Sequence, residues 1–259
     1  MALPDFRLVQ SRSGALLERV SGRGDEDQGI FIKVHGMRTL LHFWLSPHCR
    51  KIRLALTEKR LDFDLVLERP WERRSDFMFL NPAGEVPVLV ENDGTVVVHS
   101  TVICEYLEEV YPDPSLLGGV LPVMRGEVRR LMAWFDCKFN REVTVNLVGE
   151  KISKRLIGVG APNSRAIRAG QANIHTHLQY IAWLTERRRW LAGDSLSFAD
   201  LAAAAHLSTV DYVGDVPWGE HQEAKDWYAR IKSRPSFRAL LQEQVPGISP
   251  PPHYGDLDF

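Results

Sequence analysis

The chain has 259 residues, 44% of them hydrophobic, so it can bury a substantial core in one large domain or two modest ones. Its 32 basic and 33 acidic side chains nearly cancel, and a net charge of −1 provides no extended positive field for a nucleic acid. No apolar run approaches the roughly 20 residues that cross a bilayer. We therefore expect neither nucleic-acid binding nor membrane insertion.

Three scattered cysteines, Cys49, Cys104 and Cys137, argue against a disulfide framework and indicate a reducing compartment such as the cytoplasm. Residues 1–36 mix Gly, Ser, Arg and Asp without a sustained period, so we expect a poorly ordered extension. Met37 directly precedes the first convincing strand. An upstream start codon and a vector-derived leader would both explain this placement.

Residues 37–112 are expected to form a small domain that mixes strands and helices. Ser46-Pro47 is typical of an N-cap followed by the first helical position, and Ser100 is expected to cap the last helix of this region. Asn92-Asp93-Gly94 is the turn of a predicted hairpin. The predicted elements are a strand at 40–45, a helix at 46–60, a strand at 62–67, the hairpin at 86–98 and a helix at 100–111.

The second half of the chain is predicted to be helical. It follows a Pro/Gly linker, PDPSLLGG, and is expected to form a domain over residues 121–244. The C-terminal segment 245–259 holds three consecutive prolines and no period, so we expect a tail held extended and away from the helices. The candidate helices lie at about 121–150, 165–190, 197–213, 219–233 and 235–244.

Five spaced motifs carry a resemblance to the glutathione transferase superfamily over roughly residues 38–244. SPHCRKIRLAL resembles the active-site loop and first helix, NPAGEVPVL the loop before a cis-proline at Pro87, and HSTVICEYLEE the turn that binds the γ-glutamyl group. WLAGDSLSFADLAAAAHL, in which Ser197 and Asp200 form a predicted capping box, resembles the buried helix, and SRPSFRALL the last helix. The resemblance implies a thioredoxin-like α/β domain followed by an all-helical domain.

Ser46 and Cys49 are the candidate catalytic residues if the protein is an enzyme. The resemblance implies that Ser46 donates a hydrogen bond to the thiol of glutathione, whereas an N-cap serine would serve its own helix. Cys49 lies in the first helical turn, where the dipole lowers the pKa of a thiol, but a lone helix cysteine is more often a small core residue. His175, His177 and His206 have no acid or cysteine at ligand spacing, so no metal site is expected.

Two residues depart from the pattern of a glutathione pocket. The resemblance places Ser100 where a serine receives the γ-glutamyl carboxylate, but His99 replaces the acid that usually answers the ammonium. Glu85 stands where the superfamily often has Lys or Gln, and a buried carboxylate facing the ligand's glycine carboxylate would cost on the order of 4 kcal/mol. We therefore expect a degenerate site with no cofactor, unless Glu85 points to solvent. Its residues are Glu85, Val86, Pro87, His99 and Ser100.

A closer likeness within the superfamily rests on MRTLLHFWLSPHCRKIRLAL and on the acidic, aromatic tail PPHYGDLDF. The proteins that the chain resembles here are glutathione-transferase-like dimers of alphaproteobacterial cell division, which bind filaments of the division GTPase FtsZ and curve them. This likeness implies a cytoplasmic homodimer at the division site that acts on filament curvature, bundling and constriction. The alternative for the tail is that it fills a groove of its own helical domain. The expected filament-binding residues are Tyr254, Asp256, Leu257, Asp258 and Phe259.

The alternative function is an active glutathione transferase that conjugates a thiol or catalyses a glutathione-dependent reduction or isomerisation. It would need glutathione and an electrophile pocket between the domains, and the sequence does not identify the electrophile. For the dimer, part of an apolar stripe is expected to meet a second copy, with packing inside the helical domain as the competing interpretation. The stripe consists of Met124, Val128, Leu131, Met132 and Phe135.

Overall fold

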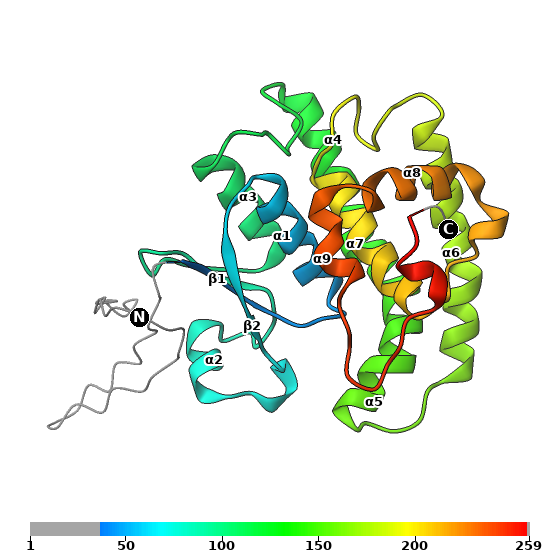
Figure 1. Cartoon of the computed structure of the whole chain (residues 1–259), viewed down its shortest axis with the longest axis horizontal. Helices are drawn as coiled ribbons and strands as arrows, with labels where there is room; N and C mark the ends of the chain where they lie inside the picture. The colour runs from blue at the N-terminus through cyan, green and yellow to red at the C-terminus, as the bar shows by residue number, and fades with distance from the viewer. Residues whose placement is uncertain (1–36, 258–259) are drawn as a thin grey trace, which may run out of the picture.

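The computed structural model describes residues 37–257, and Figure 1 shows a small sheet with its helices beside a larger group of helices. The predicted extension at residues 1–36 and the tail residues Asp258 and Phe259 lie outside the described residues. Within residues 37–257, no helix has the length and apolar character needed to span a membrane.

The sheet has four strands in the order β2-β1-β3-β4. The central strand β1 is parallel to β2 and antiparallel to β3, so that Leu40 pairs with Leu65 on one side and Leu89 on the other. Parallel pairing requires a crossover, which α1 supplies between β1 and β2. The elements are β1 (Arg38–His42), α1 (Pro47–Glu58), β2 (Phe63–Leu67), α2 (Ser75–Leu80), β3 (Val88–Val90), β4 (Val96–Val98) and α3 (Ser100–Val110).

Helices cover both faces of the sheet. On one face, Leu41 and Val88 pack with Phe77 and Leu80 of α2. The other face joins a larger core that includes α1 and α3 and continues into the helical part of the chain. This alternation follows from the strand geometry, because neighbouring side chains of a strand point to opposite faces.

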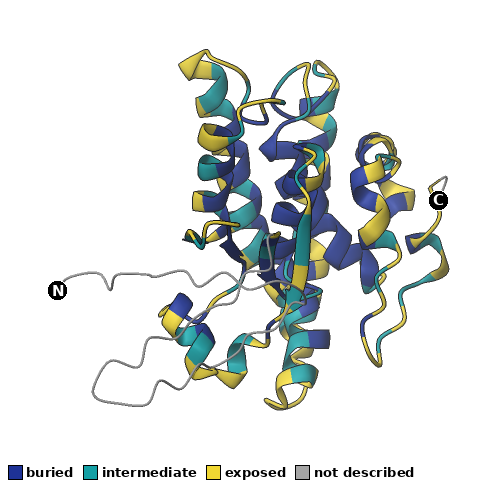
Figure 2. Ribbon diagram, turned by 60° about the vertical axis from the view of Figure 1, so that its left-hand side comes forward, coloured by how far each residue is buried: buried dark blue, intermediate teal, exposed yellow. Residues whose placement is uncertain are grey.

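The second half is helical, as predicted, and its central helix is α7 (Phe198–Tyr212). Every residue of α7 is buried, and Figure 2 shows buried residues gathered in the interior of the helical part. The predicted capping box of Ser197 and Asp200 is confirmed. Around α7 lie α4 (Pro122–Ala133), a π-helix (Trp134–Ser153), α5 (Lys154–Ile157), α6 (Ser164–Thr185), α8 (Gln222–Lys232) and α9 (Arg238–Leu241).

The apolar stripe predicted for a dimer contact is mostly core of the single chain. Val128, Leu131, Met132 and Phe135 are at most 2% exposed. The competing interpretation therefore holds for these four residues, whereas Met124, the fifth member of the stripe, is only half-buried. The four are buried because α4 and the start of the π-helix, which carries Phe135, both pack directly against α7.

The tail folds back onto the helical domain, so the expectation that prolines hold it away is wrong. Tyr254 is completely buried, and its ring meets that of Tyr212 edge to face, with ring centroids 5.0 Å apart. Its hydroxyl accepts a hydrogen bond from Arg50 Nη1 at 3.1 Å and donates to the Leu240 carbonyl at 3.3 Å. Tyr254 is thus not available as an exposed contact residue, whereas Leu257 is 44% exposed.

Candidate functional site

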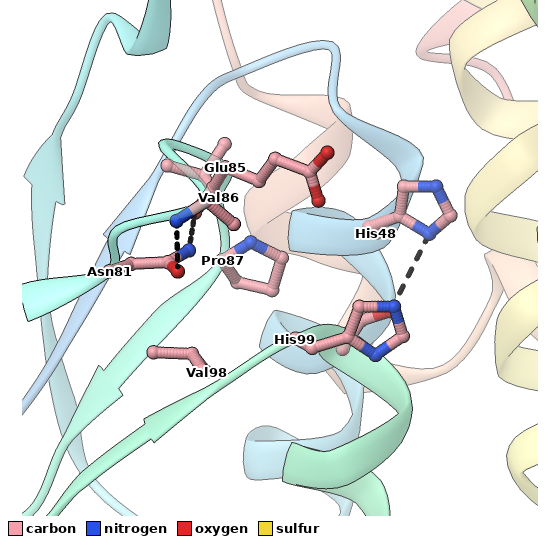
Figure 3. Close-up of a pocket in the computed structure, with 9 residues that line it drawn as sticks. His48, Asn81, Glu85, Val86, Pro87, Val98 and His99 are labelled. Carbon is pink, nitrogen blue, oxygen red and sulfur yellow. Dashed lines mark hydrogen bonds between the residues drawn. The ribbon is translucent and has the colours of Figure 1, made fainter. Parts of the chain in front are cut away.

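The loop before β3 and the start of α3 enclose a cavity of about 140 Å³. The structure brings together all five residues predicted for a glutathione-like site, and adds His48 from α1 and Asn81 from the loop (Figure 3). The lining residues are His48, Asn81, Ala83, Glu85, Val86, Pro87, Val98, His99 and Ser100.

Asn81 shapes the loop that carries Glu85, Val86 and Pro87. Its side-chain N–H donates to the Glu85 carbonyl at 2.7 Å, and its side-chain oxygen accepts from the Ala83 N–H at 3.2 Å. The peptide bond between Val86 and Pro87 is cis, as the resemblance implied. Sequence reasoning missed Asn81, although an asparagine that opens a turn commonly bonds the backbone in this way.

The start of α3 forms the opposite wall. The helix begins at Ser100 itself, so the prediction that Ser100 is its cap is wrong; His99 precedes it with a φ of 71°. Ser100 is buried and its Oγ lies 3.5 Å from His48 Nδ1. The first N–H groups of a helix have no acceptor within the helix, so this end of α3 can receive an anion.

Glu85 is exposed at the rim, and Figure 3 shows its carboxylate extended over the cavity on the side of His48. The penalty predicted for a buried carboxylate therefore does not apply, because water and salt screen an exposed charge. Within residues 37–257, no Lys or Arg lines this cavity. An anionic ligand would meet one carboxylate and two imidazoles there.

Ser46 lies on an adjoining groove of about 240 Å³, which runs between the sheet domain and the π-helix. Val86 lines both hollows and joins them. Ser46 Oγ accepts a hydrogen bond from the Cys49 N–H at 3.3 Å, which is the geometry of an N-cap. Capping uses a lone pair of the hydroxyl, and its proton is directed at the Cys49 thiol, so donation to a ligand would require the hydroxyl to turn away from Cys49.

Cys49 is not a reactive thiol in this structure. It is completely buried, and burial raises the pKa of its thiol to about 11 despite hydrogen bonds from the Ser46 side chain and the Phe43 N–H. The helix dipole does not make this thiol reactive, because loss of water disfavours the thiolate more strongly than the dipole favours it. Cys49 is the small core residue of the alternative interpretation.

A second cluster of polar groups lies where the two halves of the chain meet. Asp136 Oδ1 of the π-helix lies 3.6 Å from His48 Nδ1 and 3.5 Å from His206 Nε2 of α7. Burial lowers the pKa of His206 to about 4. Burial also opposes ionisation of Asp136, but the Lys51 ammonium and the imidazoles of His48 and His206 together outweigh it and hold the pKa of Asp136 well below its usual range. Sequence spacing missed this cluster because its members come from three separate helices.

Comparison with known proteins supports the same architecture. Family models of the glutathione S-transferase N-terminal and C-terminal domains match residues 40–115 and 170–235. FtsZ-localized protein A of Caulobacter vibrioides is 50% identical over 225 residues, which is 86% of this chain and 98% of that protein. Glutathione S-transferase 2 of Saccharomyces cerevisiae is 26% identical over 208 residues, which is 76% of this chain and 86% of that protein.

Two solved structures show the likeness in three dimensions. A glutathione S-transferase from Rhodospirillum rubrum F11 has a TM-score of 0.84 at 64% identity, and FzlA from C. crescentus has 0.83 at 50% identity. Each comparison covers 86% of this chain and 100% of the other. The predicted fold class is confirmed, and the chain belongs to the glutathione S-transferase family, with a thioredoxin-like N-terminal part and a helical C-terminal part.

Proposed function

We propose that this protein binds FtsZ filaments at the division site in the cytoplasm and modulates their curvature, bundling and constriction. The observation that carries the proposal is the 50% identity to FtsZ-localized protein A over 98% of that protein's length. The absence of a cationic residue among the described residues that line the cavity also favours a binding protein over a transferase. Glutathione carries two carboxylates, and such a lining offers them no permanent positive charge.

The tail supplies the proposed contact with the filament. Tyr254 is anchored in the helical domain, so residues 255–257 start from a fixed point. Leu257 is exposed and stands between two acids in the sequence. An apolar side chain among charges suits a partner that buries it. The proposed contact residues are Asp256, Leu257, Asp258 and Phe259.

Co-sedimentation with GTP-assembled FtsZ tests this contact. We expect Leu257→Ser to lower the fraction of protein that sediments with the polymer. Val159→Ser is the matched control, because Val159 is 56% exposed, aliphatic and distant in sequence from the tail. Equal sedimentation of the two variants would exclude the tail as the contact. No sedimentation of the unchanged protein would contradict filament binding itself.

We propose a homodimer as the working form. Proteins with this fold commonly dimerise, and three strongly exposed aliphatic side chains near the start of α4 leave apolar surface to cover. Light scattering should give twice the 29.4 kDa mass of the chain. A single-chain mass would contradict the dimer. The exposed residues are Val120, Leu121 and Val123.

An active glutathione transferase is the second candidate. The observation that favours it is the groove beside Ser46, which adjoins the Ser100 cavity through Val86. Calorimetric titration with glutathione separates the two functions, because micromolar binding favours the transferase, and millimolar or weaker binding favours the filament-binding protein. Turnover of an aromatic electrophile that is lost in Ser46→Ala would establish the transferase.

A further inference from the structure

We propose that His48, Asp136 and His206 form a binding site for a divalent transition-metal ion, with zinc as the preferred ion. The three side chains come from α1, the π-helix and α7, so the ion would join the sheet domain to the helical domain. Two imidazoles and one carboxylate are donors that zinc accepts. This site goes beyond the proposed filament binding and does not depend on it.

The distances between the donor atoms suit a tetrahedral ion. Bonds of about 2.1 Å at tetrahedral angles place neighbouring donors about 3.4 Å apart. Asp136 Oδ1 lies 3.6 Å from His48 Nδ1 and 3.5 Å from His206 Nε2. One donor atom from each residue lies within 4.8 Å of the others, so a shift of at most about 1.4 Å in the His48 side chain brings the most distant pair to this spacing.

Two buried atoms of the cluster have unmet bonding capacity. Among residues 37–257, Asp136 Oδ1 and His206 Nε2 are both buried without a hydrogen-bond partner. The His206 side chain is 0% exposed and that of Asp136 is 8% exposed. Buried polar atoms are almost always satisfied, and leaving them unpaired costs about 1–3 kcal/mol each. A cation between the two atoms satisfies both.

The surrounding contacts orient the donors for an ion. Thr144 Oγ1 lies 3.0 Å from His206 Nδ1, and a proton on Nδ1 leaves the Nε2 lone pair directed at the cluster. In the other tautomer, Nε2 carries the proton and faces Asp136 Oδ1 at 3.5 Å. This distance is longer than that of an ordinary N–H···O hydrogen bond. Lys51 binds Asp136 Oδ2 and leaves Oδ1 for the ion. Partners of this kind commonly fix metal ligands.

The charge of Lys51 decides which ions are suitable. Its ammonium repels a cation at Oδ1, so ions that bind mainly through charge, such as magnesium and calcium, are disfavoured. Zinc and its neighbours gain strongly from imidazole donors and tolerate this charge better. The His48 side chain is 29% exposed and lines the ligand cavity, so the ion has a route from solvent. Water or a ligand in the cavity would supply the fourth donor.

Cobalt(II) is the probe, because tetrahedral cobalt gives a strong visible absorption and zinc then displaces it. The full chain, stripped with a chelator and dialysed, should bind one equivalent and develop this band. We expect His48→Ala to weaken binding by at least about tenfold. His48→Gln keeps a polar side chain without the imidazole and should behave in the same way. Zinc should raise the melting temperature of the unchanged protein more than that of either variant.

His175→Ala is the control, because His175 Nδ1 lies 2.9 Å from His221 Nε2 and this second pair is an alternative place for an ion. It should keep the cobalt band. The proposal is overturned if the unchanged protein develops no band, or if the band persists in both His48 variants. A band that is lost only in His175→Ala would assign the ion to the other pair. Circular dichroism confirms that each variant is folded.

Discussion

Trp134 donates its indole N–H to His177 Nδ1 at 3.0 Å, which leaves the proton of the neutral ring on Nε2, 3.2 Å from Glu142 Oε2. Both nitrogens of His177 therefore have partners only while the ring is uncharged. The side chain is fully buried, and burial lowers the pKa of His177 to about 4 even though Glu142 favours the charged form.

This arrangement predicts that acid destabilises the protein. In the unfolded chain a histidine takes up a proton near pH 6.5, whereas the folded state keeps His177 neutral down to about pH 4. The contribution of His177 to the free energy of unfolding is thus present above pH 6.5 and is lost as the pH falls toward 4. We expect a loss of up to about 2 kcal/mol from this residue between pH 7 and pH 5.

Urea unfolding of His177→Gln at the two pH values isolates this effect. Glutamine can accept from Trp134 and donate to Glu142 without titrating, so the variant should lose less stability on acidification. Comparison with the unchanged protein is essential, because Asp200 acts in the opposite direction: burial raises the pKa of its carboxyl to about 6. Identical losses in the two proteins would show that His177 does not remain neutral.

The anchor of the tail predicts a large effect of Tyr254. Tyr254→Phe removes a hydrogen bond to the charged Arg50 and should cost about 1.5–3 kcal/mol of stability. Tyr254→Ala also empties a buried site and should cost about 3–5 kcal/mol. Leu257→Ser is the control and should change the free energy of unfolding by less than about 0.5 kcal/mol. Calorimetric melting checks all three, and unchanged melting of Tyr254→Ala would contradict the anchor.

The three thiols should differ in reactivity. Burial raises the pKa of Cys49 to about 11 and that of Cys104 to about 12, while Cys137 is exposed. Brief treatment of the native protein with iodoacetamide should therefore modify Cys137 alone, as read by mass spectrometry of peptides. Protein unfolded in urea should be modified at all three. Rapid native labelling of Cys49 would restore it as a candidate catalytic residue.

Changing two charges in the cavity should strengthen glutathione binding if the pocket is otherwise intact. Glu85→Lys replaces an exposed carboxylate by an ammonium, worth about 1 kcal/mol or roughly fivefold in affinity. His99→Glu adds a partner for the ligand's ammonium, and together the two should give at least about tenfold. Glu109→Lys changes an exposed charge on α3 outside the cavity and should have no effect. Calorimetry measures the affinity of each variant for glutathione. Equal affinity in Glu85→Lys, His99→Glu and Glu109→Lys would show that the charges in the cavity do not control binding.

Local motifs explain why much of the cavity was predictable. Val86 and Pro87 sit in one loop and His99 and Ser100 at one helix start, so short stretches of sequence define both walls. The direction of the Glu85 side chain was not predictable, because solvent exposure at a loop depends on the fold around it. The hairpin and the capping box of α7 were also visible, since both depend on residues a few positions apart.

Long-range packing explains what the sequence did not reveal. His48 and His206 are far apart in the chain, and they meet because α1 packs against α7. The prolines before Tyr254 do favour an extended backbone, and Pro251 has a φ of −65° and a ψ of 155°. That local preference does not specify direction, and burial of the Tyr254 ring against Tyr212 decides where the segment goes.

The hydrogen bonds of Arg50 also constrain the order in which the chain matures. Its guanidinium is completely buried, and its partners include Glu243 at 3.0 Å and Tyr254 at 3.1 Å. During synthesis, α1 leaves the ribosome long before these two partners do. Until the final described segment emerges, the Arg50 side of α1 therefore stays exposed to solvent, and water solvates the guanidinium. Closure of the junction between the two halves is therefore a late step, because two partners of Arg50 lie near the end of the described residues.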